Sequence, residues 1–189
     1  MSESLLNDLD RFKELYYNEN KKSTFQKKAQ KYEVAKAITG YFDVNMLLQK
    51  TAYIIPNSNK IFINYPIFKQ FAQPDNYELF VKYVQNLVSV VIDHNKTFEC
   101  HINIDTFTIS AAERYKGVIT AFSEGVFGYT EHMDAIFIYN SPLMIAKISN
   151  LLSNLLDQST RNKLTFVKKS DSEDIVSFFN ENGVRNKLV

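Results

Sequence analysis

The alternation of helical and strand patterns after residue 75 is the feature that most constrains how this chain can fold. From there on the order of segments is helix, strand, helix, strand, helix, strand and helix. Such an order is typical of βαβ units, in which a helix connects two parallel strands and packs on the sheet. The runs at 135–139 and 164–167 are apolar throughout, as central parallel strands are when helices cover both faces. The sequence therefore predicts the α/β class, with a mainly parallel sheet and flanking helices.

The N-terminal part of the chain has a different pattern. Apolar residues recur at helical spacing in residues 3–18, and a second helix is expected from about 24 to 39. Residues 52–65 predict a β-hairpin, because two β-rich runs flank a turn that contains proline and asparagine. We expect a segment of two N-terminal helices at 1–45 and an α/β domain at 46–189. Together they form one compact unit, because a chain of 189 residues suits a single hydrophobic core.

Capping boxes mark three of the expected helix starts, the third of which, Ser170 with Glu173, opens a short final helix at 171–180. In a capping box a polar N-cap side chain is followed three residues later by a glutamate. Asp75 with Glu78 gives the first, and Ser110 with Glu113 gives the second. The second box predicts a helix that continues to about Phe127.

The composition favours a globular protein of a reducing compartment. The chain is 45% hydrophobic with a net charge of +1, so nothing in its overall charge points to nucleic acid. Cys100 is the only cysteine, which leaves no intramolecular disulfide and no cysteine-based zinc site. The N-terminus is acidic from the start, and no apolar run approaches the roughly 20 residues of a membrane span. We expect a cytoplasmic protein with no nucleic-acid partner and no metal.

Basic residues gather in one short segment, residues 21–36, which holds six lysines and one glutamate. A solvated helix face gives such a pattern, and so does a surface that contacts anionic membranes. In the second interpretation each basic residue near the membrane contributes about 1 kcal/mol. The residues expected to face a membrane in a transient, peripheral contact are Lys21, Lys22, Lys27, Lys28 and Lys31.

No catalytic motif is present in the sequence. There is no glycine-rich phosphate loop, no HExxH zinc motif and no GxSxG nucleophile elbow. The strand at 97–105 alternates strictly and places Glu99, His101 and Asp105 on one side, which is a pattern that acid/base chemistry can use. A strand that turns its polar side to solvent gives the same pattern, and we favour that interpretation. We therefore expect no enzymatic activity.

Four segments in the second half of the chain carry a resemblance to a known family. They are INID (102–105), YTEHM (129–133), IFIYNSP (136–142) and LLDQSTRNKLTFV (155–167). In this order and at these separations, residues 97–180 resemble the C-terminal half of a CRAL-TRIO domain, the Sec14-like lipid-binding fold. Thr130 stands where the family usually has proline, and the N-terminal helical part is shorter than in the family.

The resemblance implies a lipid-binding pocket that is closed by a gate helix at 143–156. The apolar face of this helix contains Met144, Ile145, Ile148, Leu151, Leu152 and Leu155, a pattern that an ordinary core helix also gives. In phosphatidylinositol-binding members a glutamate, a threonine and a lysine hold the headgroup. The matching positions here are Glu131, Thr160 and Lys163. A hydroxyl and a lysine suit a phosphate, and a carboxylate accepts hydrogen bonds from inositol hydroxyls.

Three functions follow as hypotheses. The first is the binding, and the transfer between membranes, of a phosphatidylinositol-type phospholipid or another hydrophobic ligand, with no cofactor besides the bound lipid. The second is a module for protein partners that keeps the fold but has a filled pocket. The third is an STAS-like regulatory domain, which has a similar alternation but lacks an apolar cavity and the pair of Thr160 and Lys163. If the side of strand 97–105 with Glu99 and His101 faced the pocket, that pocket would be too polar for acyl chains.

Overall fold

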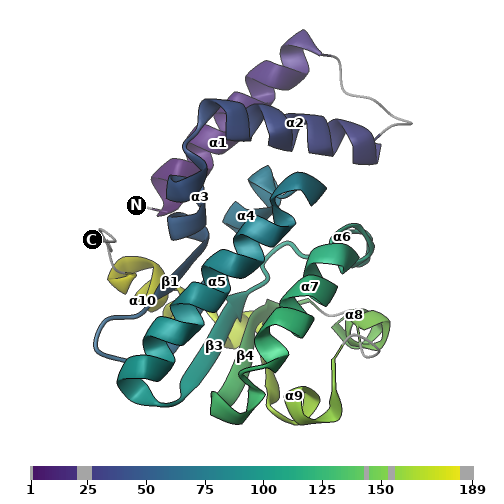
Figure 1. The fold of residues 1–189 in the computed structure, drawn as a ribbon. Coiled ribbons are helices and arrows are strands. Elements are labelled where there is room, and N and C mark those ends of the chain that lie inside the picture. Colours follow the sequence, from purple (N-terminus) through teal and green to yellow (C-terminus); the bar gives the residue numbers. More distant parts are fainter. Residues whose placement is uncertain (1, 21–26, 143–144, 153–155, 184–189) are drawn as a thin grey trace.

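The computed structural model describes residues 2–20, 27–142, 145–152 and 156–183. Figure 1 shows how the elements follow one another from the N-terminus to the C-terminus. The elements in chain order are α1 (Ser2–Glu19), α2 (Lys27–Tyr41), α3 (Val44–Thr51), β1 (Ala52–Ile54), β2 (Lys60–Asn64), α4 (Tyr65–Phe71), α5 (Pro74–Asn95), β3 (Phe98–Asn103), α6 (Ile109–Arg114), α7 (Lys116–Phe127), η1 (Thr130–His132), β4 (Met133–Ser141), α8 (Ile145–Leu152), α9 (Gln158–Asn162), β5 (Leu164–Lys168), η3 (Lys169–Asp171) and α10 (Glu173–Asn182).

The strands form one sheet in the order β1-β2-β3-β4-β5. Strands β2, β3, β4 and β5 are parallel, and β1 pairs antiparallel with β2 through the hairpin. The predicted α/β class with a mainly parallel sheet is confirmed. The apolar residues are in register across the sheet, since Ile63 lies beside Ile102, Ile102 beside Ile138, and Ile138 beside Phe166. One face of the sheet is therefore a continuous apolar surface.

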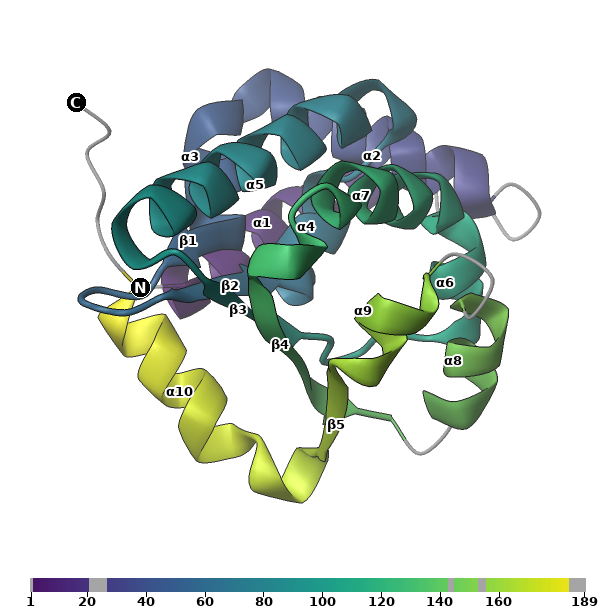
Figure 2. The ribbon, with the colours of Figure 1, turned by 60° about the horizontal axis from the view of Figure 1, so that its bottom comes forward.

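Helices cover both faces of the sheet (Figure 2). Helices α5 and α7 pack against each other and lie on the apolar face, while α10 lies on the opposite face. Helices α8 and α9 lie on the same side of the sheet as α7, near β5, and α8 packs against α6. The cavity described below lies on this apolar side, between β4 and β5 and the helices α7, α8 and α9.

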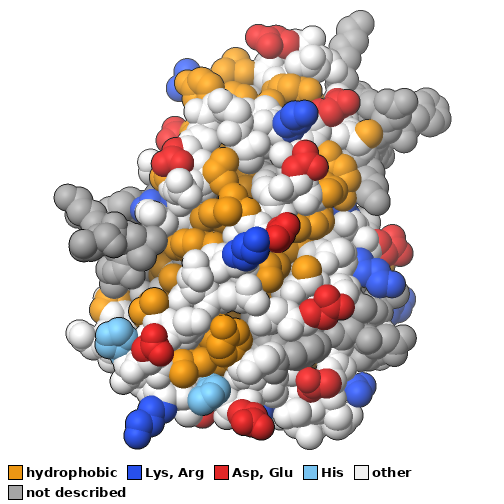
Figure 3. Space-filling view, in the orientation of Figure 1, with side chains coloured by type: hydrophobic (Ala, Val, Ile, Leu, Met, Phe, Trp, Pro, Cys, Tyr) orange, Lys and Arg blue, Asp and Glu red, His pale blue; other side chains and the backbone are white. Residues whose placement is uncertain are grey.

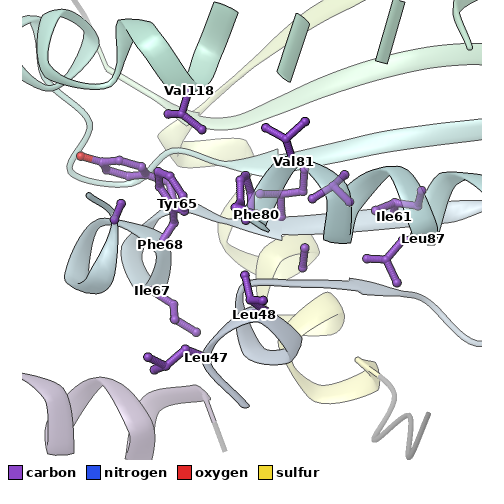
Figure 4. Close-up of a cluster of buried hydrophobic side chains, with 14 of the residues drawn as sticks. Leu47, Leu48, Ile61, Tyr65, Ile67, Phe68, Phe80, Val81, Leu87 and Val118 are labelled. Carbon is purple, nitrogen blue, oxygen red and sulfur yellow. The ribbon is translucent and has the colours of Figure 1, made fainter. Parts of the chain in front are cut away.

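The largest buried cluster joins the sheet to the helices on its apolar face. It includes Leu47, Ile61, Phe68 and Phe80, which Figure 4 shows converging from α3, β2, α4 and α5. Side chains of α1 and α2, among them Leu9, belong to the same cluster. The apolar stripes that predicted the N-terminal helices are thus the surfaces by which those helices attach to the rest of the chain.

The three predicted capping boxes are wrong in detail, and in the last of them the N-cap of α10 is Ser172 rather than Ser170. Helix α5 begins at Pro74, with Gln73 as N-cap, whose backbone N–H donates to the Asn76 side chain at 3.1 Å. Proline suits the first helical position because it has no N–H to satisfy and a φ angle that is already helical. The predicted helix from Ser110 is two helices, α6 and α7, that meet at Tyr115. The N-cap of α6 is Thr108, whose side chain accepts a hydrogen bond from the backbone N–H of Ala111 at 3.2 Å.

Candidate functional site: an apolar cavity beside the β4–β5 edge

A cavity of about 240 Å³ lies between the apolar face of the sheet and the helices that cover it. The sheet side of the cavity is aliphatic and aromatic and consists of Ile63, Ile102, Ile136, Ile138, Leu164 and Phe166. The helix side adds further rings and branched chains, including Phe68, Tyr115, Val118, Ile119 and Phe122. A cavity with such a lining is suited to an apolar molecule, because few of the groups around it bind water.

Part of the predicted gate helix closes one end of this cavity. Ile145 and Ile148, from α8, both line it, and the side chain of Ile148 is buried. The helix spans Ile145–Leu152 and is thus shorter than the predicted 143–156 in the part that is described. Met144 and Leu155 lie outside the described residues, and for Leu151 and Leu152 only the backbone is described. The gate function of α8 stays a prediction.

Thr160 and Ser123 are the buried polar residues in the described lining of the cavity, and Thr160 is the one whose hydroxyl has no partner among the described residues. It lies in the short helix α9, where Asp157 is the N-cap and its carboxylate accepts a hydrogen bond from the backbone N–H of Thr160 at 2.6 Å. The Thr160 side chain lines the cavity and is only 4% exposed. Its hydroxyl oxygen Oγ1 is buried and has no hydrogen-bond partner among the described residues. A buried hydroxyl without a partner costs about 1–3 kcal/mol, so this group gains from a partner in a ligand.

Arg161 brings a positive charge to the edge of the same cavity. It follows Thr160 in α9, it is exposed, and it lines the cavity together with Phe166, which is 39% exposed. Among the described lining residues it is the only charged side chain. The cavity is therefore bordered by two exposed residues, Arg161 and Phe166.

The other two predicted headgroup residues lie elsewhere. Lys163 is half-buried, and its Nζ donates hydrogen bonds to the backbone oxygens of Thr130 at 2.7 Å and Met133 at 2.5 Å. Glu131 is exposed in η1. Neither residue lines the cavity. The structure thus brings Thr160 to the cavity but not Glu131 or Lys163, whose headgroup role stays a prediction.

The polar side of β3 faces away from the cavity. Glu99, His101 and Asn103 lie on the face of the sheet that α10 covers, where His101 contacts Phe179 of α10 with a ring-centroid distance of 4.8 Å. His101 is 4% exposed and Asn103 is 5% exposed, so the expectation that this side faces solvent is wrong. The apolar side of β3 faces the cavity and its polar side faces α10. The polar residues of β3 therefore do not make the cavity wall unsuitable for a lipid.

His101 is the centre of a small hydrogen-bond network on that second face. Its Nε2 lies 3.0 Å from Glu99 Oε2, its Nδ1 lies 2.8 Å from the Tyr139 hydroxyl, and Lys60 forms an ion pair with Glu99. Since the carboxylate only accepts, Nε2 carries the proton of the neutral ring, and the Tyr139 hydroxyl donates to Nδ1. Phe137 stacks on the imidazole with a centroid distance of 5.0 Å.

Burial shifts the pKa values of His101 and Tyr139 in this network. It lowers the pKa of His101, although the hydrogen bond and charge of Glu99 act in the opposite direction. Burial also raises the pKa of Tyr139 to about 12. Partial burial acts to raise the pKa of Glu99, but the hydrogen bonds from Lys60 and His101 and their charges bring it below its ordinary value. His101, which α10 covers, thus contributes to the contact between the sheet and that helix.

The predicted membrane-facing lysines fall mostly outside the described structure. Lys21 and Lys22 lie outside the described residues, and for Lys27 and Lys28 only the backbone, in α2, is described. Lys31 is exposed on α2. On the described part of the face shown in Figure 3, basic and acidic side chains alternate and gather in no patch of one sign. The contact of these lysines with a membrane stays a prediction.

Two features are absent from the described residues. No helix among them is both long and apolar enough to cross a membrane. No group of three or more His, Cys, Asp or Glu side chains among them is arranged to hold a metal ion.

Comparisons with known proteins identify the fold. Twenty chains of solved structures match this one, and one of them is described as "Crystal structure of Sfh5". It superposes with a TM-score of 0.56 at 19% sequence identity, covering 67% of this chain and 50% of the other. The chain thus spans about half the length of that protein, and the match shows a common fold. No curated protein matches the sequence.

The sequence profile of the CRAL/TRIO domain matches residues 77–188, which is more than half of the chain. The profile therefore begins within α5 and covers all later described elements, while β2 and α4, which also contribute side chains to the cavity, precede it. The resemblance stated from the four sequence segments is confirmed, and the STAS-like alternative is set aside. On this match and on the Sec14-like α/β fold, the chain belongs to the CRAL/TRIO family of lipid-binding domains.

Proposed function

We propose that this protein binds a hydrophobic ligand of the lipid class in the cavity beside β4 and β5. The observation that carries the proposal is the cavity itself, whose described lining is apolar apart from Arg161, Ser123, two tyrosines and Thr160, whose buried hydroxyl has no partner among the described residues. Filling it with hydrocarbon replaces empty space with van der Waals contacts and removes the ligand from water. Each buried methylene contributes about 0.8 kcal/mol.

The polar contacts that we propose for the ligand involve only residues that line the cavity. A phosphatidylinositol-type ligand, as the family resemblance implies, would need Glu131 and Lys163 to turn toward a headgroup. The amine of Lys163 donates to two backbone oxygens, and freeing it would leave those oxygens without this donor. We therefore assign the polar contact of the ligand to Thr160, and we leave phosphatidylinositol as one of the ligands to be tested.

Transfer between membranes is the second part of the proposal. A movement of α8, whose Ile145 and Ile148 line the cavity, would widen the path by which a ligand enters and leaves. The lysines at 21–31 would favour a reversible, peripheral encounter with anionic lipid, by about 1 kcal/mol for each residue near the surface. Both steps depend on ligand binding, which is therefore the first property to measure.

The direct test is native mass spectrometry of the purified protein, combined with extraction and identification of bound lipids. We expect a stoichiometric hydrophobic ligand, or its uptake from vesicles of phosphatidylcholine with phosphatidylinositol. Replacing Ile148 by glutamine places an amide in the cavity wall and should lower binding at least tenfold. Ala146→Gln is the matched control, because Ala146 is exposed on the same helix.

The outcomes separate the hypotheses. Ligand-free protein that takes up no lipid, with Ile148→Gln and Ala146→Gln behaving alike, would refute the proposal. It would favour the module for protein partners, which was expected to have a filled pocket. Thermal unfolding of both variants shows whether each remains folded, so that a loss of binding is not mistaken for a loss of structure.

A further inference from the structure

We propose that the ligand is a single-chain amphiphile with an acidic head, whose chain fills the cavity and whose head meets Thr160 and Arg161. This inference rests on the proposed function and names the chemical class of the ligand. It follows from three properties of the cavity: its volume, the position of its unpartnered hydroxyl, and the sign of the charge at its opening.

The volume allows one short chain. An engineered cavity of about 150 Å³ in a protein core holds a benzene molecule. By the same ratio, the cavity of about 240 Å³ holds on the order of ten non-hydrogen atoms. Each acyl chain of a membrane phospholipid is longer than this, and a phospholipid carries two of them. A single chain of medium length fits, with its polar end left at the opening.

The unpartnered hydroxyl fixes where the polar end lies. Thr160 is next to Arg161 in α9, and both line the cavity. Thr160 Oγ1 has no hydrogen-bond partner among the described residues, while the tyrosine hydroxyl of Tyr115 donates to the backbone oxygen of Lys69 at 3.4 Å. Rotation about the Cα–Cβ bond of Thr160 exchanges its hydroxyl and methyl positions within the same volume. The hydroxyl can thus donate to an oxygen of the ligand head.

The charge at the opening selects an anion. Arg161 is exposed and lines the cavity, and no acidic side chain is among the described lining residues. Asp157, the nearest carboxylate in sequence on this helix, accepts the backbone N–H of Thr160 and is not part of the lining. A guanidinium binds a carboxylate or a phosphate through two parallel hydrogen bonds. Lys163 is not available for this task while it donates to two backbone oxygens.

The test is a binding series by calorimetry with linear acids from hexanoic to hexadecanoic acid, and with the alcohols of equal length. Affinity should rise about fourfold per methylene and level off near ten chain atoms. The acid should bind about threefold to fivefold more tightly than its alcohol, because an exposed ion pair contributes up to about 1 kcal/mol. Decyl phosphate in place of decanoic acid distinguishes a phosphate head from a carboxylate head.

Variants assign the preference to the named residues. In Arg161→Gln the acid should bind only as well as the alcohol, and the affinity for the alcohol should stay within about twofold. Arg161→Lys should restore part of the preference. Lys168→Gln removes a charge from β5 without changing the lining, and it should leave the acid preference intact.

Three results would overturn the inference while leaving the proposed function in place. They are equal binding of acids and alcohols, no effect of Arg161→Gln on the acid, and affinity that continues to rise to two-chain phospholipids. If the proposed function itself is wrong, the result differs from these three. In that case neither acids, alcohols nor vesicle lipids bind, and Ile148→Gln does not change binding.

Discussion

Replacing Thr160 by valine should stabilise the ligand-free protein and weaken ligand binding at the same time. Valine keeps the shape of threonine but removes the hydroxyl, which is buried and has no partner among the described residues. Removing an unpaired buried hydroxyl should raise the free energy of unfolding by about 1 kcal/mol or more. For a chain of this length 1 kcal/mol corresponds to an increase in melting temperature of about 2–4 °C.

Thr51 offers a matched control for this change. Its side chain is 0% exposed, and its hydroxyl donates to the backbone oxygen of Leu47 at 2.8 Å. Thr51→Val therefore removes the same atom from an equally buried threonine but loses a hydrogen bond, which should lower stability by about 1 kcal/mol. The two substitutions should shift the melting temperature in opposite directions.

The assay is thermal and urea unfolding of protein from which bound lipid has been extracted, followed by binding of decanoic acid. We expect Thr160→Val to bind the acid about threefold to tenfold more weakly than the wild type, because a charge-assisted hydrogen bond is lost. If Thr160→Val lowers stability as Thr51→Val does, the hydroxyl of Thr160 has a partner within the protein. The assignment of this group to the ligand would then be wrong.

Two further predictions concern the second face of the sheet and two glycines. Burial lowers the pKa of His101, so between that value and the unfolded pKa of about 6.5 the unfolded chain binds more protons. Stability should therefore fall with decreasing pH in this window, by up to about 1.4 kcal/mol per pH unit, and His101→Gln should remove that part of the slope in urea unfolding. A methyl group at Gly183 would overlap the buried ring of Tyr53, so Gly183→Ala should cost about 1–3 kcal/mol. Gly40→Ala meets no atom within 4 Å in α2 and should stabilise by about 0.5–1 kcal/mol, and equal effects of the two substitutions would contradict this packing.

The order of the elements could be read from the sequence because it depends on local periodicity. The apolar runs at 135–139 and 164–167 lie in β4 and β5, and the hairpin and both N-terminal helices lie near their expected positions. Short elements escaped prediction. Helix α9 has five residues, too few for a helical period to show, although its N-cap Asp157 was already part of the family pattern.

The sequence does not show which helix packs on each face of the sheet. Strict alternation in β3 shows that Glu99, His101 and Asn103 share a side, but it does not show which layer covers that side. The cover is α10, at the far end of the chain, and one of the two hydrogen-bond partners of His101 is Tyr139, 38 residues away. A polar strand face that looked like a surface is therefore an interior one.

Sequence by itself determined the α/β class, the order of the main strands and longer helices, and the family, because these depend on periodicities and short motifs along the chain. The tertiary structure alone decided the site. Thr160 and Lys163 are three residues apart and equally plausible as ligand contacts, yet one lines the cavity and the other donates to Thr130 and Met133. The size of the cavity depends likewise on how side chains from β4, α7 and α8 pack together. Packing between distant segments sets these contacts, and no local pattern in a sequence records it.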